Sequence, residues 1–280
     1  MDLEKAYLHC RRQAFGHYEN FPVAGLLLPQ PQRNAVAAIY AYARTADDFA
    51  DEPQYAGQRV RLLKDWMGRL ERPAQGNPVF IALADARERF AIPKGLLVDL
   101  VQAFLQDCRK ARYRNFKELQ AYCRLSADPI GRLMLRVFEA DSAEALRESD
   151  AICTALQLTN HWQDLSSDVQ SRDRIYLPQD EMKRFGVTDA QLKAGRWTQA
   201  MDGLMGLQVS RAEALFAAGE SLPKRLGGRL GLQVGLTLLG GRRILEKIRQ
   251  QGFDTLKARP KLGLGDLPWF AAKVVGGAWQ

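Results

Sequence analysis

Apolar and polar residues alternate with the period of an α-helix along most of the chain. The Ala-rich residues 32–52 and the Leu/Val-rich residues 95–113 each place apolar side chains on one face, which predicts two amphipathic helices. The same spacing predicts long helices in residues 116–140, 142–169, 197–222 and 231–251. Pro129 lies inside one of these segments and removes a backbone hydrogen bond there, so we expect a kink or a break.

Sustained two-residue alternation, the sign of a β-strand, is nearly absent. Prolines fall at junctions between the predicted helices, and the connections look short, so neighbouring helices should pack antiparallel. No linker or low-complexity segment interrupts the pattern. The chain is therefore predicted to form one all-α domain over residues 1–280, with an irregular tail from about residue 258, where Gly, Pro and Trp are frequent.

The composition is that of an ordinary globular protein, with 46% hydrophobic and 26% charged residues among 280. A formal net charge of +8 favours an anionic partner: nucleic acid, a phosphorylated substrate or an acidic membrane surface. The four cysteines form no CxxC pair, which is typical of reduced thiols in the cytoplasm. The first residues do not resemble a signal peptide, and no run reaches the roughly 18 apolar residues of a membrane span. We expect a cytoplasmic protein.

Two of the predicted helices carry oxygen-bearing side chains at intervals of three or four residues, which places them on one helix face. These are Asp47 and Asp51 in the first helix and Gln157, Asn160, Asp164 and Asp168 in the second. Carboxylates four residues apart repel each other, and a cation between them turns this cost into binding. Oxygen ligands suit Mg²⁺, which keeps some of its waters and bridges to substrate phosphates.

Basic residues accompany both acidic regions. Arg44 lies one turn before Asp47, and Arg172 and Arg174 follow Asp168. Paired carboxylates with neighbouring cations fit a site for a metal ion and a diphosphate. The alternative for either DxxxD pair alone is a solvated acidic helix face, which is the more common origin of such a pair.

Other sequence signals for chemistry are missing. The chain has no GxGxxG after a predicted strand, no P-loop and no GxSxG elbow. Its histidines form no ExxH or HxxxH pair, which argues against a di-iron bundle. Asp48 points about 100° away from Asp47. It should therefore be solvated or support a ligand instead of binding metal.

The acidic segments resemble the two aspartate-rich regions of the squalene and phytoene synthases, class I enzymes that join prenyl diphosphates head to head. The first is YAYARTADDFAD at residues 40–51, and the second is QLTNHWQDLSSDVQSRDRIYLP at residues 157–178. The stretch DCRKARYRNFKELQAYC at residues 107–123 resembles another block of this family. The resemblance extends from about residue 17 to about residue 252.

The resemblance implies an all-α isoprenoid synthase bundle with a central cavity, where the two acidic regions face each other across its mouth. Catalytic Mg²⁺ would be held by Asp47, Asp51, Asn160, Asp164 and Asp168. The diphosphate would be contacted by His17, Arg44, Gln157, Arg174 and Tyr176. Tyr18 and Tyr40 would stabilise a carbocation with their π-faces, or else be ordinary core tyrosines.

One branch of the family is indicated by the stretch HYENFPVA at residues 17–24. Many members that couple two prenyl diphosphates carry a basic residue where Glu19 stands, and a Tyr where Gly241 stands. Together with Trp162 and the SADPIG stretch, these features resemble the hydroxysqualene synthases. Such enzymes ionise presqualene diphosphate and add water, without NADPH, beside a presqualene diphosphate synthase and a flavin-dependent reductase of squalene and hopanoid synthesis. Glu19 and Asn20 are the candidates for placing the water.

Two alternatives remain open. The first is a coupling enzyme of the same family that makes presqualene diphosphate, squalene or phytoene. The second is a non-catalytic helical scaffold or membrane-binding adaptor. Because the Lys and Arg residues are mostly spread out, we expect no nucleic acid partner. The tail with Trp269, Phe270 and Trp279 would either touch the inner membrane face as a peripheral contact or pack on the domain.

Overall fold

The computed structural model describes residues 2–15, 29–72 and 76–275. Helices dominate this part of the chain, which confirms the all-α prediction, and the only β-type pairing within it is a single bridge between Arg112 and Ile175. No helix among the described residues is long and apolar enough to cross a membrane. The cysteines at positions 10, 108, 123 and 153 are free.

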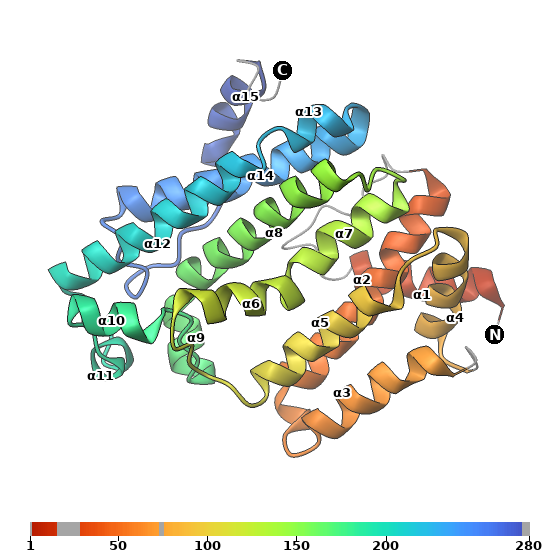
Figure 1. Cartoon of the computed structure of the whole chain (residues 1–280), viewed down its shortest axis with the longest axis horizontal. Coiled ribbons are helices and arrows are strands. Elements are labelled where there is room, and N and C mark those ends of the chain that lie inside the picture. Colours follow the sequence, from red (N-terminus) through yellow and green to blue (C-terminus); the bar gives the residue numbers. More distant parts are fainter. Residues whose placement is uncertain (1, 16–28, 73–75, 276–280) are drawn as a thin grey trace. The chain divides into compact units, whose positions relative to one another are not determined.

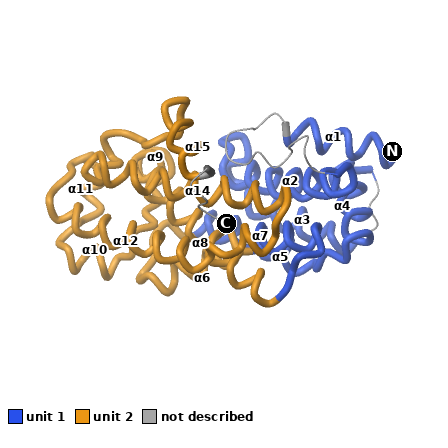
Figure 2. The backbone as a smooth tube through the Cα atoms, turned by 90° about the horizontal axis from the view of Figure 1, so that it is seen from above, with its two compact units in different colours: residues 1–109, 129–142 blue, residues 110–128, 143–280 orange. Residues whose placement is uncertain are grey.

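Contacts divide the chain into two compact units, which Figure 2 shows in different colours. The first unit comprises residues 1–109 and 129–142, and the second comprises residues 110–128 and 143–280. The first acidic region belongs to the first unit and the second acidic region to the second. Each unit is described here by itself.

The first unit packs its helices around an aromatic core. Its helices are α1 (Leu3–Phe15), α2 (Gln30–Asp51), α3 (Arg59–Gly68), α4 (Pro78–Arg89), α5 (Lys94–Asp107) and α7 (Asp128–Val137), with short 3₁₀ turns η2 (Pro53–Tyr55) and η3 (Arg69–Glu71). The buried rings of Tyr42 and Trp66 stack at 5.8 Å, and Phe80 meets Trp66 edge-on at 4.6 Å. The Trp66 Nε1–H donates to the Tyr42 carbonyl at 3.2 Å, which satisfies the buried indole N–H. This core fixes α2, which carries the first acidic region.

In the second unit, α6, α12 and α14 pack around α8 (Figure 1). Its helices are α6 (Phe116–Ser126), α8 (Ala143–Gln163), α9 (Leu165–Arg172), α10 (Gln179–Phe185), α11 (Asp189–Lys193), α12 (Gln199–Ala218), α13 (Leu222–Leu226), α14 (Gly228–Gln250) and α15 (Leu267–Val275), with the 3₁₀ turn η4 (Leu264–Asp266). Trp162 and Phe216 are fully buried between these helices. The packing holds α8, which leads into the second acidic region.

Local sequence signals explain where several helices begin and end. The Asn115 side chain accepts a hydrogen bond from the Glu118 amide at 2.9 Å and starts α6. Pro129 coincides with a break between α6, which ends at Ser126, and α7, which begins at Asp128. The expected kink or break is thus a break. The tail differs from the irregular segment that its composition suggested, because α15 forms there.

Candidate functional site

The first acidic region lies at the C-terminal end of α2. Asp47 and Asp51 are one turn apart, their side chains are only partly buried, and the helix ends at Asp51. The last turn of α2 contains no basic residue. Both carboxylates therefore lie at the negative end of the helix dipole and repel each other across one turn. A bound cation would offset both unfavourable effects.

Arg44 is the cation beside this pair on the helix surface. Its Nη1 lies 3.1 Å from Asp47 Oδ2, and its Nη2 lies 2.9 Å from Asp48 Oδ1. All three side chains are about one-third exposed, at 30%, 35% and 30% for Arg44, Asp47 and Asp48. Asp48 thus helps to hold Arg44 beside Asp47 in a place that water and a solute can reach.

Tyr40 lies one turn before Arg44 on α2 and is partly buried. Burial raises the pKa of its hydroxyl, and the nearby Asp47 and Asp48 carboxylates add to the rise, while Arg44 opposes it. The ring is thus within electrostatic reach of the first acidic region and keeps its phenolic proton at neutral pH. Its role in stabilising a carbocation stays a prediction.

The second acidic region crosses a break between two helices. α8 ends at Gln163 and α9 begins at Leu165, with Asp164 between them at φ −100° and ψ 11°. Hydrogen bonds one turn apart continue through the break, from the Asp164 amide to the Asn160 carbonyl at 2.8 Å and from the Asp168 amide to the Asp164 carbonyl at 2.9 Å. The oxygen-bearing side chains therefore still follow one another at intervals of one helical turn. The break itself was not predicted, since the spacing of three and four continues through it.

Burial changes along this region. Asn160 is exposed, Gln157 and Asp164 are partly buried, and Asp168 is buried. Burial raises the pKa of the Asp168 carboxyl to about 6; Arg172, with Nη1 at 3.2 Å from Oδ1, lowers it, and Asp164 adds to the rise. A raised carboxyl pKa means that the charged form lacks full compensation, as expected of a carboxylate that would gain from a bound cation.

A sharp turn after α9 brings Arg174 and Tyr176 back toward residues 111–113. Asp173 adopts a left-handed conformation with φ 50°. The Ile175 amide then donates to the Ala111 carbonyl at 2.9 Å, and Ile175 pairs with Arg112 in the single bridge. The structure thus unites two of the sequence blocks that carry the family resemblance.

Arg112 fastens this turn. Its Nε lies 2.6 Å from the Asp189 carboxylate at the start of α11, and its Nη2 lies 2.7 Å from the Asp173 carboxylate. The Arg112 and Lys193 cations lower the pKa of the Asp173 carboxyl to about 2. Arg174, only 9% exposed, is held by the backbone on both sides of it.

An aromatic cluster lies beneath the second acidic region. The Tyr176 ring stacks on His161 at 3.6 Å and 12°, and Tyr113 and Tyr122 surround Tyr176 at 5.6 and 5.9 Å. Burial, with a smaller contribution from the Arg174 cation, lowers the pKa of His161 to about 3. His161 is therefore a neutral packing ring next to Asn160. Contact between Tyr176 and substrate stays a prediction, because the described position of its ring is in this cluster.

Arg259 is a cation of this region that the sequence pattern did not identify. It follows α14 and forms a two-pronged ion pair with Asp164, and the Arg259 and Asp164 side chains are 41% and 27% exposed. The neighbouring Pro260 carbonyl accepts a hydrogen bond from the buried Gln163 Nε2 at 2.6 Å. The two contacts hold residues 259–260 over the end of α8. Arg259 and Asp164 are 95 residues apart, so helix periodicity could not predict that they pair.

The donor set fits Mg²⁺ in one particular way. Among the described His, Cys, Asp and Glu side chains, no three are grouped closely enough to hold a metal ion. Each acidic region instead offers two carboxylates, with the amide oxygen of Asn160 added in the second. Mg²⁺ commonly uses one or two carboxylates, several waters and substrate phosphates, so such pairs suit it without forming a cage of protein atoms alone.

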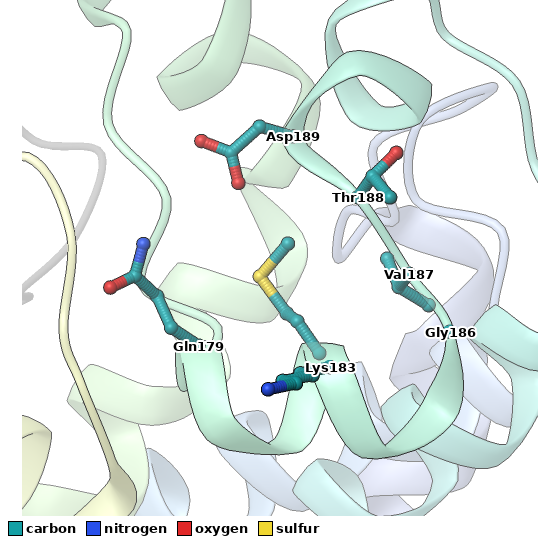
Figure 3. A pocket seen from close by; sticks show the side chains of 7 residues that line it. Gln179, Lys183, Gly186, Val187, Thr188 and Asp189 are labelled. Atoms are coloured by element: carbon teal, nitrogen blue, oxygen red, sulfur yellow. The ribbon is translucent and has the colours of Figure 1, made fainter.

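One described pocket is separate from the predicted site residues. It measures about 310 Å³ and opens between α10 and α11 (Figure 3). It is lined by Gln179, Met182, Lys183, Gly186, Val187, Thr188 and Asp189. The predicted residues His17, Tyr18, Glu19 and Asn20 lie outside the described residues.

Comparisons with known proteins identify the family. The family model for squalene/phytoene synthase matches residues 15–266, which include both acidic regions. The chain belongs to the squalene/phytoene synthase family. Membership in this family of isoprenoid diphosphate-processing enzymes supports the prediction of an enzyme and confirms the resemblance seen in the motifs.

Relatives within the family differ in reaction. The chain is 33% identical to hydroxysqualene synthase of Rhodopseudomonas palustris over 87% of its own length and 83% of that protein. It is 31% identical to phytoene synthase 1 of Arabidopsis thaliana over 98% of its length and 68% of that protein. In structure it is similar to squalene synthase HpnC of Alicyclobacillus acidocaldarius, with a TM-score of 0.83, 38% identity and coverage of 90% and 95%. The isoprenoid synthase fold follows from this similarity.

Proposed function

We propose that this family member is a hydroxysqualene synthase, which ionises presqualene diphosphate and captures the cation with water. The C–O bond to the diphosphate breaks and its electron pair leaves with the diphosphate. Water then forms the new C–O bond and releases a proton. The reaction gives hydroxysqualene and diphosphate without net oxidation or reduction, so no nicotinamide is needed.

The residues of each acidic region have defined tasks in this proposal. Mg²⁺, when bound by Asp47, Asp51, Asn160, Asp164 and Asp168, supplies positive charge for the leaving diphosphate. Arg44 and Arg174 donate hydrogen bonds to the same oxygens, since guanidinium groups pair well with phosphate. Gln157 and Tyr176 add polar contacts, together with His17. Glu19 and Asn20 place the water that ends the reaction, and the π-faces of Tyr40 and Tyr18 stabilise the cation.

One observation in the described structure supports the choice of branch. Gly241 on α14 faces the ring of Phe216 on α12, and a Cβ at this position would overlap Phe216 Cζ and lie 3.0 Å from Leu156 Cδ2. A Tyr at this position, as in many coupling members, cannot fit unless the Phe216 ring and the Leu156 side chain shift. The packing of the second unit is thus adapted to Gly241, where many coupling members have a Tyr. Glu19, where many of them have a basic residue, favours the same branch in the sequence.

A product assay tests the proposal. The purified protein receives presqualene diphosphate and Mg²⁺ in ¹⁸O-labelled water without nicotinamide, and products are examined by mass spectrometry. We expect an alcohol that carries the label. Squalene that forms only on addition of NADPH contradicts the proposed branch.

The second candidate is a coupling enzyme, because a phytoene synthase matches 98% of the chain. Consumption of farnesyl or geranylgeranyl diphosphate alone, with formation of presqualene diphosphate or phytoene, identifies that reaction. Turnover of none of these substrates, by a protein that binds neither Mg²⁺ nor diphosphate, favours a non-catalytic scaffold. A partner synthase and a flavin-dependent reductase belong to the proposal only if the alcohol is formed.

A further inference from the structure

The C-terminal segment after α14 presents leucines to the solvent. Leu262, Leu264 and Leu267 are 44%, 85% and 59% exposed. A single exposed leucine is ordinary on a protein surface, whereas three within residues 262–267 form an apolar patch. We call residues 261–273 the tail patch.

α15 continues this apolar surface. Its sequence, LPWFAAKVV, contains one charged residue, Lys273. Among the described elements, its extensive contact is with η4, which directly precedes it. α15 projects from the rest of its unit in Figure 1. An apolar helix that packs so little normally buries its surface against something else.

The tail patch is held in place by a buried carboxylate. Asp266, 3% exposed, lies 2.8 Å from Arg243 Nε and 2.6 Å from Lys247 Nζ, both on α14. It also accepts the Gly263 amide at 2.8 Å. Hydrogen bonds from Lys247 and Arg243 hold the pKa of Asp266 far below its usual range. The leucines on either side are therefore presented from a fixed base.

The exposed charged residues within residues 256–273 are all basic. Lys257, Lys261 and Lys273 are exposed cations within residues 256–273, and Arg259 is paired with Asp164. Asp266 is the one acidic residue in this stretch, and it is turned inward and neutralised. Exposed leucines with exposed lysines before and after them in the sequence complement an apolar layer with a negatively charged surface.

We propose that the tail patch docks on an anionic lipid bilayer, inserting Leu264 and Leu267 while the surrounding lysines meet the headgroups. A second copy of the chain would bring an identical cationic patch against the first, which is electrostatically unfavourable. The inference goes beyond the proposed reaction, because membrane docking requires neither the acidic regions nor turnover. Docking would place the enzyme where a long isoprenoid substrate is dissolved.

Vesicle co-sedimentation of the full chain tests this inference. The probes are vesicles of phosphatidylcholine and vesicles of equal phosphatidylcholine and phosphatidylglycerol, at low and high salt. We expect binding to the anionic vesicles that weakens at high salt. Leu264→Asp should weaken it about tenfold or more, because the leucine proposed to insert into the bilayer is replaced by a charge of the same sign as the lipid.

Leu232→Asp is the matched control, since it replaces a leucine of 42% exposure on α14 by the same charge outside the tail patch. It should bind anionic vesicles much more tightly than Leu264→Asp does. Circular dichroism establishes that both variants fold. Equal binding by the two variants overturns the proposal, as does absence of wild-type binding or equal wild-type binding to both vesicle types. A wild-type dimer that Leu264→Asp converts to a monomer also overturns it, because a second copy then covers the patch.

Discussion

The two acidic regions share one spacing and lie in different surroundings. Asp47 and Asp51 occupy one continuous helix, and Asp47 pairs with a neighbour only three residues away. Asp164 lies at a helix break and is paired with Arg259, and Asp168 is buried in the helix that follows. The first region is therefore a local product of helix periodicity. The second depends on contacts between distant parts of its unit, and these contacts constrain its carboxylates more.

The largest expected effect is the difference in kcat between a variant of Asp164, a proposed metal ligand, and a variant of Asp48, a proposed supporting carboxylate. Asp164→Asn should lower kcat about a thousandfold or more, because the leaving diphosphate loses several kcal/mol of charge stabilisation. Asp48→Asn in the first region should change kcat by about tenfold at most, since its partly exposed ion pair with Arg44 is worth ~1 kcal/mol or less. Diphosphate release at saturating substrate measures both. Near-normal turnover of Asp164→Asn would falsify its assignment as a ligand.

Packing behind the second region gives the next effect. Gly241→Ala should lower the free energy of unfolding by ~1–3 kcal/mol, because the new Cβ overlaps Phe216 and forces the core apart. Gly206→Ala is the control on α12, where a Cβ would meet Phe253 Cζ at an ordinary 3.7 Å. That change should be neutral or stabilising by up to ~1 kcal/mol. Urea unfolding compares the two, and equal stability of both variants would refute tight packing at Gly241.

Acid should lower the free energy of unfolding through His161, which lies in the helix of the second acidic region. The helix of the first acidic region, α2, contains no histidine. The unfolded imidazole takes up a proton near pH 6.5, whereas burial delays this in the folded chain to about pH 3. Wild-type stability therefore falls as pH drops below about 6.5, by ~1.4 kcal/mol per pH unit from this group. His161→Phe keeps a stacking ring and should remove this slope in urea unfolding between these pH values. Contributions from Asp168 cancel in the difference, and parallel pH curves would contradict the burial of His161.

The smallest effect concerns the cations that already lie beside each region. In the proposed site, Mg²⁺ would compete with Arg259 for Asp164, so Arg259→Gln should tighten Mg²⁺ binding about fivefold, equivalent to ~1 kcal/mol for a partly exposed ion pair. Arg44→Gln should tighten it less, because the Arg44 charge is shared between Asp47 and Asp48. Titration calorimetry with Mg²⁺ alone measures both. A larger effect at Arg44 would reverse the contrast between the regions.

Periodicity predicted the helices that carry both acidic regions, because amphipathic spacing is a local property of the sequence. It also placed a break near Pro129. It did not predict the break at Asp164, where the spacing of polar residues continues unchanged. The Arg259 pair and the stacking of Tyr176 on His161 arise from tertiary contacts, which no local pattern contains. Short helices such as α15 were missed because Gly and Pro dominate their surroundings.

The bridge between Arg112 and Ile175 has a consequence for how the gene can change. It closes a backbone loop, so the number of residues from Asp168 to Ile175 is fixed by the structure. Deleting one residue between Asp168 and Ile175 would place the next residue opposite Arg112. The side chains of Arg174 and Ile175 would then exchange the sides to which they point. Substitutions between Asp168 and Ile175 can accumulate one at a time. An insertion or deletion there would displace Asp168, Arg174 and Tyr176 relative to one another in a single step.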